Sequence, residues 1–173
     1  MYDSPPVKPI RRKAIALGLL MVVGGCAGPP QRSGGSGRQA VTPQIDPAKR
    51  QEVIMTALSL LETDYRYGGA RPVRGFDCSG LVKFVFQAAA QTPLPHNTAA
   101  IAGLSQSIRR SRLQPGDLVF FNTLNRSNSH MGIYLGDDTF INAPSTGGRV
   151  RIDSLKNPYY ARHFESAGTL FAD

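Results

Sequence analysis

The chain has 173 residues, which gives room for one domain of ordinary size and excludes a second catalytic domain. Twenty Lys and Arg against twelve Asp and Glu give a formal charge of +8, and sixteen bases against eleven acids leave +5 outside residues 1–25. This moderate positive balance, without basic residues interleaved with aromatic ones, suits a polyanionic surface and argues only weakly for nucleic acid, so we expect no nucleic-acid partner.

The first 25 residues have the pattern of a secretion signal. A basic start precedes the apolar run 14–23, which is too short for a permanent transmembrane helix, where about 20 residues are needed. Val23-Gly24-Gly25-Cys26 resembles the bacterial lipobox, which implies signal cleavage before Cys26 and lipid modification of its thiol. Ala27 stands where a signal for inner-membrane retention would resemble aspartate, so we expect a lipid-anchored cell-envelope protein, at the periplasmic face of the outer membrane in a Gram-negative cell. The alternative is ordinary signal cleavage nearby, with an unmodified thiol.

Residues 26–47 are predicted to be the anchor cysteine and a flexible linker, because they are rich in Pro, Gly and Ser and poor in large apolar side chains. A disordered remnant without a tethering role fits the same composition. The folded domain is expected over residues 48–173, since Asp46 precedes Pro47 as at the first turn of a helix.

Within this domain, helical patterns come first and β-type patterns follow. Two helices are predicted from apolar residues at helical spacing around 53–61 and 81–89, with a short one over 99–104. Five strands are predicted over residues 118–121, 131–135, 139–143, 149–152 and 168–171. This order indicates an α+β fold in which N-terminal helices pack on a C-terminal antiparallel sheet of about five or six strands.

Cys78 lies where a glycine-rich turn meets the second helix. A cysteine at a helix N-terminus meets the positive end of the helix dipole and unpaired backbone N–H groups, which lower the pKa of the thiol and favour the thiolate. If Cys26 carries lipid, Cys78 has no disulfide partner within the chain. The sequence therefore predicts a nucleophilic thiol. The three histidines and two cysteines lack metal-ligand spacing, so we expect neither a metal nor another cofactor.

A thiol nucleophile needs a base and a polar group that orients the base. His130 begins a β-type run in which Gly132 clears the same face, so another side chain could approach closely. His130 and Asn142 each lie six residues from Gly136, and a hairpin turning symmetrically about this glycine makes them a directly opposed pair with Cβ atoms roughly 4.5–5.5 Å apart. The Asn142 oxygen would then accept from one imidazole N–H and leave the other nitrogen to face Cys78. A register slip of one residue would send Asn142 to the wrong face.

The other two histidines are weaker candidates for the base. His96 lies in a loop after Leu94-Pro95 and could line a pocket, but it has no strand partner to orient it. His163 is predicted to be a surface or packing residue. The alternative for His130 itself is a core histidine with satisfied hydrogen bonds.

Five segments in one order resemble the NlpC-type peptidases, which are papain-like cysteine hydrolases that cut bacterial cell-wall peptides. The segments span roughly residues 48–173 and are Tyr65-Arg66-Tyr67-Gly68-Gly69, Phe76-Asp77-Cys78-Ser79-Gly80, 113–121, 129–136 and Ala143-Pro144-Ser145. The resemblance implies a papain-like fold with Cys78 as nucleophile, His130 as base and Asn142 at the third position. The family most often has histidine at that third position, and an amide can also orient a base.

The resemblance also implies roles for three neighbours of the thiol. Tyr65 matches a family tyrosine whose hydroxyl lies near the nucleophile, so it is a candidate for the oxyanion site, with core packing as the alternative. Asp77 and Ser79 match positions that help to recognise the peptide or brace the helix start, and both could equally be helix caps. His96 and Ile101 depart from the arginine and glutamine that the family commonly has, which affects the expected substrate details.

The function expected from these residues is a cysteine endopeptidase that hydrolyses peptidoglycan stem peptides and acts as a monomer. The resemblance implies cleavage between γ-D-glutamate and a diamino acid. Two alternatives remain open at this point. One is a papain-like amidase or acyltransferase with the same three residues, and the other is a noncatalytic cell-wall-binding lipoprotein.

Overall fold

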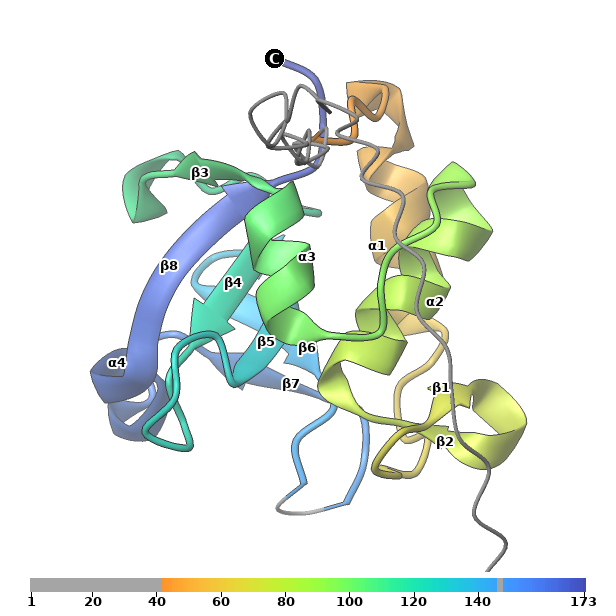
Figure 1. Cartoon of the computed structure of the whole chain (residues 1–173), viewed down its shortest axis with the longest axis vertical. Coiled ribbons are helices and arrows are strands. Elements are labelled where there is room, and N and C mark those ends of the chain that lie inside the picture. The colour runs from red at the N-terminus through yellow and green to blue at the C-terminus, as the bar shows by residue number, and fades with distance from the viewer. Residues whose placement is uncertain (1–41, 146–147) are drawn as a thin grey trace, which may run out of the picture. The chain divides into compact units, whose positions relative to one another are not determined.

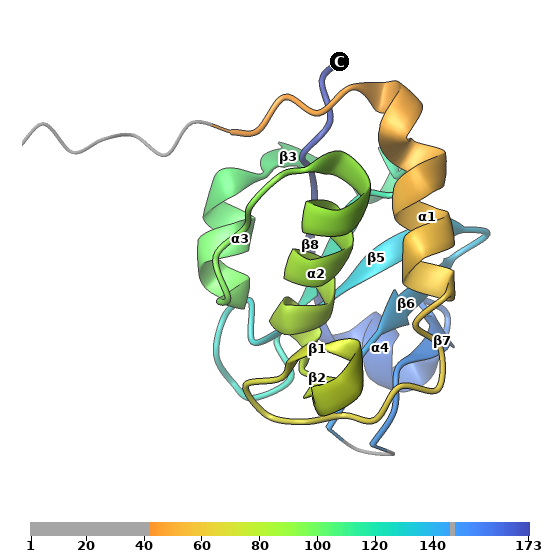
Figure 2. The same cartoon turned by 90° about the vertical axis from the view of Figure 1, so that its right-hand side faces the viewer.

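The structure described is a computed structural model, and it covers residues 42–145 and 148–173. The fold has two layers, and the first of them consists of helices. A 3-10 helix, η1 (Pro47–Lys49), leads into α1 (Arg50–Leu58), and α2 (Cys78–Ala90) and α3 (Thr98–Leu104) follow. Figure 2 shows α2 between the other two α-helices, with the sheet behind them. The three predicted helices are confirmed.

The second layer is a six-stranded antiparallel sheet, seen beside the helices in Figure 1. Its strands, in spatial order, are β3 (Gln106–Ile108), β8 (Phe164–Thr169), β4 (Leu118–Phe121), β5 (His130–Gly136), β6 (Thr139–Asn142) and β7 (Arg151–Ser154). Helices followed by an antiparallel sheet confirm the α+β prediction. The smaller elements are β1 (Ala70–Arg71), η2 (Pro72–Arg74), β2 (Gly75–Phe76), η3 (Arg110–Arg112) and α4 (Pro158–His163).

Besides the short elements β1, η2, β2 and η3, the sequence missed β3 and α4, and it displaced two of the strands that it predicted. β3 has no apolar run of its own and forms only by pairing with β8 at the edge of the sheet. α4 is a six-residue helix that the Asn157 side chain caps by accepting from the backbone N–H of Tyr159 at 2.9 Å. The strand predicted over 149–152 is β7, two residues later, and the strand predicted over 168–171 is β8, which begins four residues earlier.

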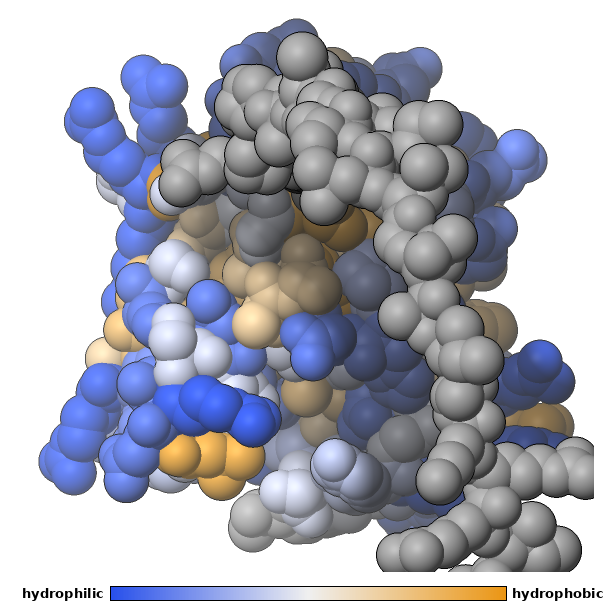
Figure 3. All heavy atoms as spheres, viewed as in Figure 1, coloured by the Kyte–Doolittle hydropathy of each residue, from blue (hydrophilic) through white to orange (hydrophobic). Residues whose placement is uncertain are grey.

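The sheet is covered on both faces. The larger core lies between the helices and one face of the sheet, and it includes the fully buried side chains of Leu81, Phe86, Leu118, Met131 and Ile133. A second cluster on the opposite face packs against α4 and contains Val119, Phe121, Phe140, Leu155 and Tyr160. His130 and Asn142 point to this second face, because they alternate with Met131 and Ile141 of the first. On the face shown in Figure 3, hydrophilic residues predominate and hydrophobic ones lie among them.

The start of the domain is tied to its end. Asp46 caps η1 by accepting from the backbone N–H of Ala48 at 2.9 Å, as the Asp-Pro pattern predicted. Ile45, which the sequence assigned to the linker, is buried, and its backbone bonds to Leu170 and Ala172. The signal segment, Cys26 and the linker up to residue 41 lie outside the described residues. In the described ranges, every helix is too short or too polar to cross a bilayer.

The β5–β6 hairpin does not turn about Gly136, so the predicted register is wrong. Asp137 and Asp138 form the turn, each with positive φ (50° and 56°), and Gly136 pairs with Thr139. The register then shifts between Tyr134 and Gly136, after which Tyr134 pairs with Phe140 and Ile133 with Ile141. One more step along this ladder places Asn142 beside Gly132, so His130 and Asn142 are diagonal neighbours on one face instead of a directly opposed pair.

Candidate active site

The Cys78 thiol is the first side chain of α2 and is partly buried. Its sulfur lies 3.7 Å from the Thr98 hydroxyl oxygen. Burial raises the pKa of the thiol above its ordinary value, while hydrogen bonds from Thr98 and from the backbone N–H groups of Ser79 and Met131 lower it, and the Asp77 carboxylate raises it further. The predicted lowering of the Cys78 pKa is therefore wrong, because loss of hydration outweighs the favourable groups at the helix start.

Asp77 holds the start of α2 in place. One carboxylate oxygen accepts from the Gly80 backbone N–H (2.7 Å), the Ser79 hydroxyl (3.1 Å) and His96 Nε2 (2.8 Å). The other accepts from the backbone N–H of Gly68 at 2.8 Å. Asp77 is thus the helix cap and also joins two loops at the thiol, and Ser79 is buried against it.

Glycines allow the loop before β1 to cross the start of α2. The Gly69 carbonyl oxygen accepts from the Asp77 backbone N–H at 3.0 Å. A Cβ atom on Gly80 would clash with that same carbonyl oxygen. The glycine that follows Cys78 and Ser79 in the sequence is therefore required by close backbone packing.

His130 is buried at the start of β5, and Asn142 orients its ring. His130 Nε2 lies 2.9 Å from Asn142 Oδ1. An amide oxygen only accepts, so Nε2 carries the proton and Nδ1 keeps a lone pair. Burial lowers the pKa of His130, and the Asn142 hydrogen bond and the Asp153 charge oppose this in part. The ring is therefore held in its neutral form, in which it can act as a base.

Sequence reasoning missed the polar groups behind Asn142. Its amide nitrogen donates to Asp153 Oδ2 at 2.9 Å and to the Arg151 carbonyl oxygen at 3.3 Å. The Tyr160 hydroxyl donates toward the same carboxylate oxygen (3.1 Å) and lies 3.3 Å from Asn142 Oδ1. The pairing of Asn142 with Arg151 on β6 and β7 brings these groups together. The strand predicted over 149–152 ends one residue before Asp153, whereas β7 runs from Arg151 to Ser154, so Asp153 was not among the candidates.

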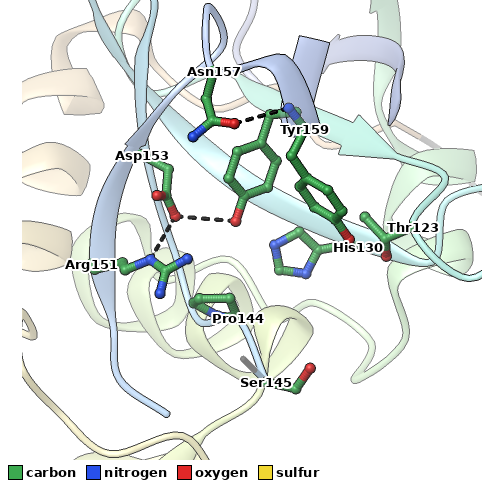
Figure 4. A pocket seen from close by; sticks show the side chains of 9 residues that line it. Thr123, His130, Pro144, Ser145, Arg151, Asp153, Asn157 and Tyr159 are labelled. Atoms are coloured by element: carbon green, nitrogen blue, oxygen red, sulfur yellow. Dashed lines mark hydrogen bonds and ion pairs between the residues drawn. The ribbon is translucent and has the colours of Figure 1, made fainter. Parts of the chain in front are cut away.

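Two adjacent clefts meet at His130. The larger, about 550 Å³, has Cys78, His130, Tyr65, His96 and Thr98 in its wall, and we call it the Cys78 cleft. The smaller, about 300 Å³, has His130, Arg151, Asp153 and Tyr159 in its wall, and we call it the Arg151 cleft. Figure 4 shows His130 in this smaller cleft, across from Asp153 and Arg151 of β7. The thiol and the imidazole are thus brought together in one cleft, and the imidazole is open to a second.

The remaining candidates divide between the cleft and the outside. Tyr65 lines the Cys78 cleft, and burial, together with the nearby Asp77 and Cys78, raises the pKa of its hydroxyl, so it stays a hydrogen-bond donor. His96 also lines the cleft and bonds to Asp77. His163 Nδ1 bonds instead to the Tyr159 carbonyl oxygen at 2.7 Å. Among the described residues, no group of three or more His, Cys, Asp or Glu could hold a metal ion.

The model of the NlpC/P60 family matches residues 62–169, which include every residue placed in the two clefts. The chain belongs to the NlpC/P60 family. Murein DD-endopeptidase MepH of Escherichia coli (strain K12) is 38% identical over 127 residues, which cover 69% of this chain and 47% of that protein. Peptidoglycan DL-endopeptidase CwlO of Bacillus licheniformis is 36% identical over 121 residues, covering 66% of this chain and 26% of that protein. The chain thus spans less than half the length of these relatives.

The solved structures agree with this assignment to the NlpC/P60 family. A Staphylococcus aureus protein described as similar to a lipoprotein of the NLP/P60 family has a TM-score of 0.66 and 28% identity, over 76% of this chain and 44% of that chain. The predicted resemblance and the papain-like α+β fold are confirmed. As a member of NlpC/P60, this chain has asparagine where the resemblance most often implies histidine, and the roles of Cys78, His130 and Asn142 stay predictions.

Proposed function

We propose that this chain is a cysteine endopeptidase that hydrolyses peptidoglycan stem peptides, with Cys78 as nucleophile, His130 as base and Asn142 as the group that orients His130. One observation carries the proposal: a buried histidine, held at Nε2 by an amide oxygen 2.9 Å away, shares a cleft with a thiol at a helix start. A histidine that served only the core would not need to line that cleft.

The neutral thiol and the neutral imidazole define the first step of the proposed reaction. The sulfur attacks the carbonyl carbon of the scissile amide while its proton passes to His130 Nδ1. The carbonyl oxygen takes the negative charge, and the Tyr65 hydroxyl and the Cys78 backbone N–H are the proposed donors to it. The C–N bond then breaks, the amine leaves with the proton from His130, and a thioester to Cys78 remains.

The second half of the reaction uses the same groups in reverse order. His130 Nδ1 takes a proton from water, whose oxygen attacks the thioester carbon. The C–S bond breaks, the peptide leaves as a carboxylic acid, and the proton returns to the sulfur. Asn142 keeps Nε2 protonated throughout, so Nδ1 alone exchanges protons.

The bond that we propose is the one between γ-D-glutamate and the diamino acid of the stem peptide, as the sequence resemblance implies. MepH is named for DD-endopeptidase activity and CwlO for DL-endopeptidase activity, so the names of the relatives differ in the bond. Asp77, Ser79 and His96 lie at one side of the Cys78 cleft and are proposed to contact the peptide on the acyl side of that bond.

The test is digestion of purified muropeptides followed by mass measurement of the fragments. We expect the wild-type protein to cut, C78A to lose all cutting, and H130A to lose about 10²- to 10⁴-fold of kcat, the usual contribution of a general base. The matched control is H163A, which removes a histidine outside both clefts and should leave kcat unchanged. Cutting by C78A would contradict the mechanism. Transfer of acyl groups to lipids or other amines would favour an acyltransferase, and binding without products would favour a wall-binding protein.

A further inference from the structure

The Asn142 side chain can serve His130 in one of its two amide orientations only. With Oδ1 toward the ring, Nε2 of His130 is protonated and Nδ1 is the basic nitrogen. With the amide turned by 180°, its nitrogen would donate to Nε2, and the proton of the neutral ring would move to Nδ1. The lone pair would then point at Asn142, and no base would face the thiol. Something other than His130 must therefore fix the amide.

The partners on the nitrogen side of Asn142 fix this orientation. Both are groups that only accept: the Asp153 carboxylate at 2.9 Å and the Arg151 carbonyl oxygen at 3.3 Å. A turned amide would place its oxygen against these two oxygens. Asn142 is fully buried, so water does not relieve that contact. The carbonyl oxygen is a backbone group that the β6–β7 pairing supplies whatever residue stands at position 151. The carboxylate, in contrast, is present only because residue 153 is aspartate.

Asp153 is itself held in position by two donors. Arg151 Nε lies 2.9 Å and the Tyr160 hydroxyl 3.1 Å from the same Oδ2 that accepts from Asn142. Tyr160 comes from α4, so this oxygen joins β6, β7 and α4. The Asp153 side chain is 15% exposed and lies in the wall of the Arg151 cleft. The group is therefore placed by tertiary contacts and does not depend on substrate.

We propose that Asp153 is a positioning residue that sets the Asn142 amide and, through it, the tautomer of His130. The proposal rests on the proposed role of His130 as a base. It assigns the function to the accepting oxygen of Asp153 and not to its charge. A carboxamide at position 153 can present an oxygen at the same point, whereas an apolar side chain cannot.

The direct test is ¹⁵N NMR of the full chain with ¹⁵N-labelled histidine, at a pH where the imidazole is neutral. The chain has three histidines, and H130Q identifies the signals of His130. We expect Nε2–H in wild type and in D153N, and a mixed or Nδ1–H tautomer in D153L. The matched control is E52L, which removes an exposed carboxylate of α1 that pairs with Lys49 away from both clefts, and it should keep Nε2–H.

A second pair of variants tests the same logic if D153L fails to fold. N142D sets two carboxylates against each other, and we expect kcat to fall at least a hundredfold. Adding D153N exchanges donor and acceptor: the amide at position 153 donates to the carboxylate at position 142, which still accepts from Nε2–H. The double variant N142D/D153N should recover kcat to within about tenfold of D153N. Absence of recovery would show that the groups at positions 142 and 153 do not act on each other.

The outcomes separate this inference from the proposed function. Nε2–H retained in folded D153L, Nδ1–H in wild type, or N142D/D153N no better than N142D would overturn the role of Asp153. If wild type shows the Nε2–H tautomer that D153L loses but releases no fragments from muropeptides, the positioning stands and the endopeptidase proposal fails.

Discussion

Burial holds both Cys78 and His130 in their neutral forms. It raises the pKa of the thiol and lowers the pKa of the imidazole, so a resting thiolate–imidazolium pair is disfavoured on both sides. In the proposed mechanism, the proton therefore moves when the sulfur attacks, and the orientation of His130 matters more than a preformed charge. The Thr98 hydroxyl and the backbone N–H groups beside the sulfur stabilise the thiolate as it forms.

The reactivity of Cys78 should follow its raised pKa. We expect the rate of alkylation by iodoacetamide to be low at pH 6–7 and to rise with a midpoint at or above the ordinary thiol range, near 8.5. The measurement is the rate of mass gain against pH, with C78S as the control that reports reaction at Cys26. A rate that is already maximal at pH 6 would show that the thiolate is preformed.

His130 should make the folded protein sensitive to acid. Its pKa is lowered in the folded state, so the unfolded chain binds the proton more readily below its ordinary value of about 6.5. The stabilisation from keeping His130 neutral is thus complete above about pH 6.5 and is lost as the pH falls through the lower folded value. We expect the Tm of wild type to drop in this window and the drop to be smaller in H130Q. Equal drops by calorimetry would contradict this assignment.

At the scale of elements, the β5–β6 hairpin decides whether His130 and Asn142 meet. Next to the turn at Asp137 and Asp138, Gly136 pairs with Thr139. This pairing is one residue out of step with the rest of the ladder, where Tyr134 pairs with Phe140. The irregularity at Leu135 absorbs this residue and returns Asn142 to the face of His130. Two departures from a simple hairpin thus compensate, and the predicted contact forms although the predicted register was wrong.

Gly132 is the position where this hairpin tolerates no side chain. A Cβ atom there would lie 2.6 Å from a ring carbon of Phe140, 2.7 Å from the Ile141 carbonyl oxygen and 3.2 Å from Asn142 Cβ. We expect G132A to cost about 1–3 kcal/mol of the free energy of unfolding and to lower kcat, because it displaces Asn142. Denaturant titration and muropeptide kinetics measure both effects.

The matched glycine substitution lies in α3. A Cβ atom on Gly103 meets nothing within 4 Å, so G103A should stabilise the protein by about 0.5–1 kcal/mol with kcat unchanged. If G132A behaved like G103A, the close approach at β5 would not be real.

At the scale of the whole molecule, Arg50 joins the helical layer to the sheet. Its guanidinium bonds to Asp117 at 2.8 Å and to the Pro115 carbonyl oxygen at 2.9 Å, and it lies over the Phe171 ring at 4.1 Å. Asp117 is almost fully buried and also accepts from the backbone N–H of Gln114. This pair fixes α1 against the strands that carry the cleft.

Breaking this buried pair should be costly. D117A leaves a mostly buried guanidinium without its carboxylate, and we expect a loss of about 3 kcal/mol in the free energy of unfolding. R149A breaks the exposed pair with Glu62 and should cost less than about 1 kcal/mol. Equal losses in urea titrations would mean that Arg50 does not tie the layers together.

The proposed lipid anchor is also a property of the whole chain. We propose that Cys26 carries lipid and holds the domain at the cell envelope. In cells that express the full chain, C26S should move the protein from the membrane fraction to the soluble fraction and abolish incorporation of labelled palmitate. C78S is the control and should stay in the membrane fraction. Unchanged fractionation of C26S would exclude the anchor.

The sequence by itself determined the order of helices before strands, Asp77 and Cys78 at a helix start, and the placement of His130 and Asn142 on one face of a hairpin, because these depend on local periodicity and on short-range turns. It missed β3 and α4, which form through pairing and packing with distant residues, and it placed the hairpin turn one residue too early. Only the tertiary structure decided the sign of the Cys78 pKa change and the partners of Asn142. Burial and the meeting of β6, β7 and α4 are properties of the packed molecule, and no local pattern in the chain encodes them.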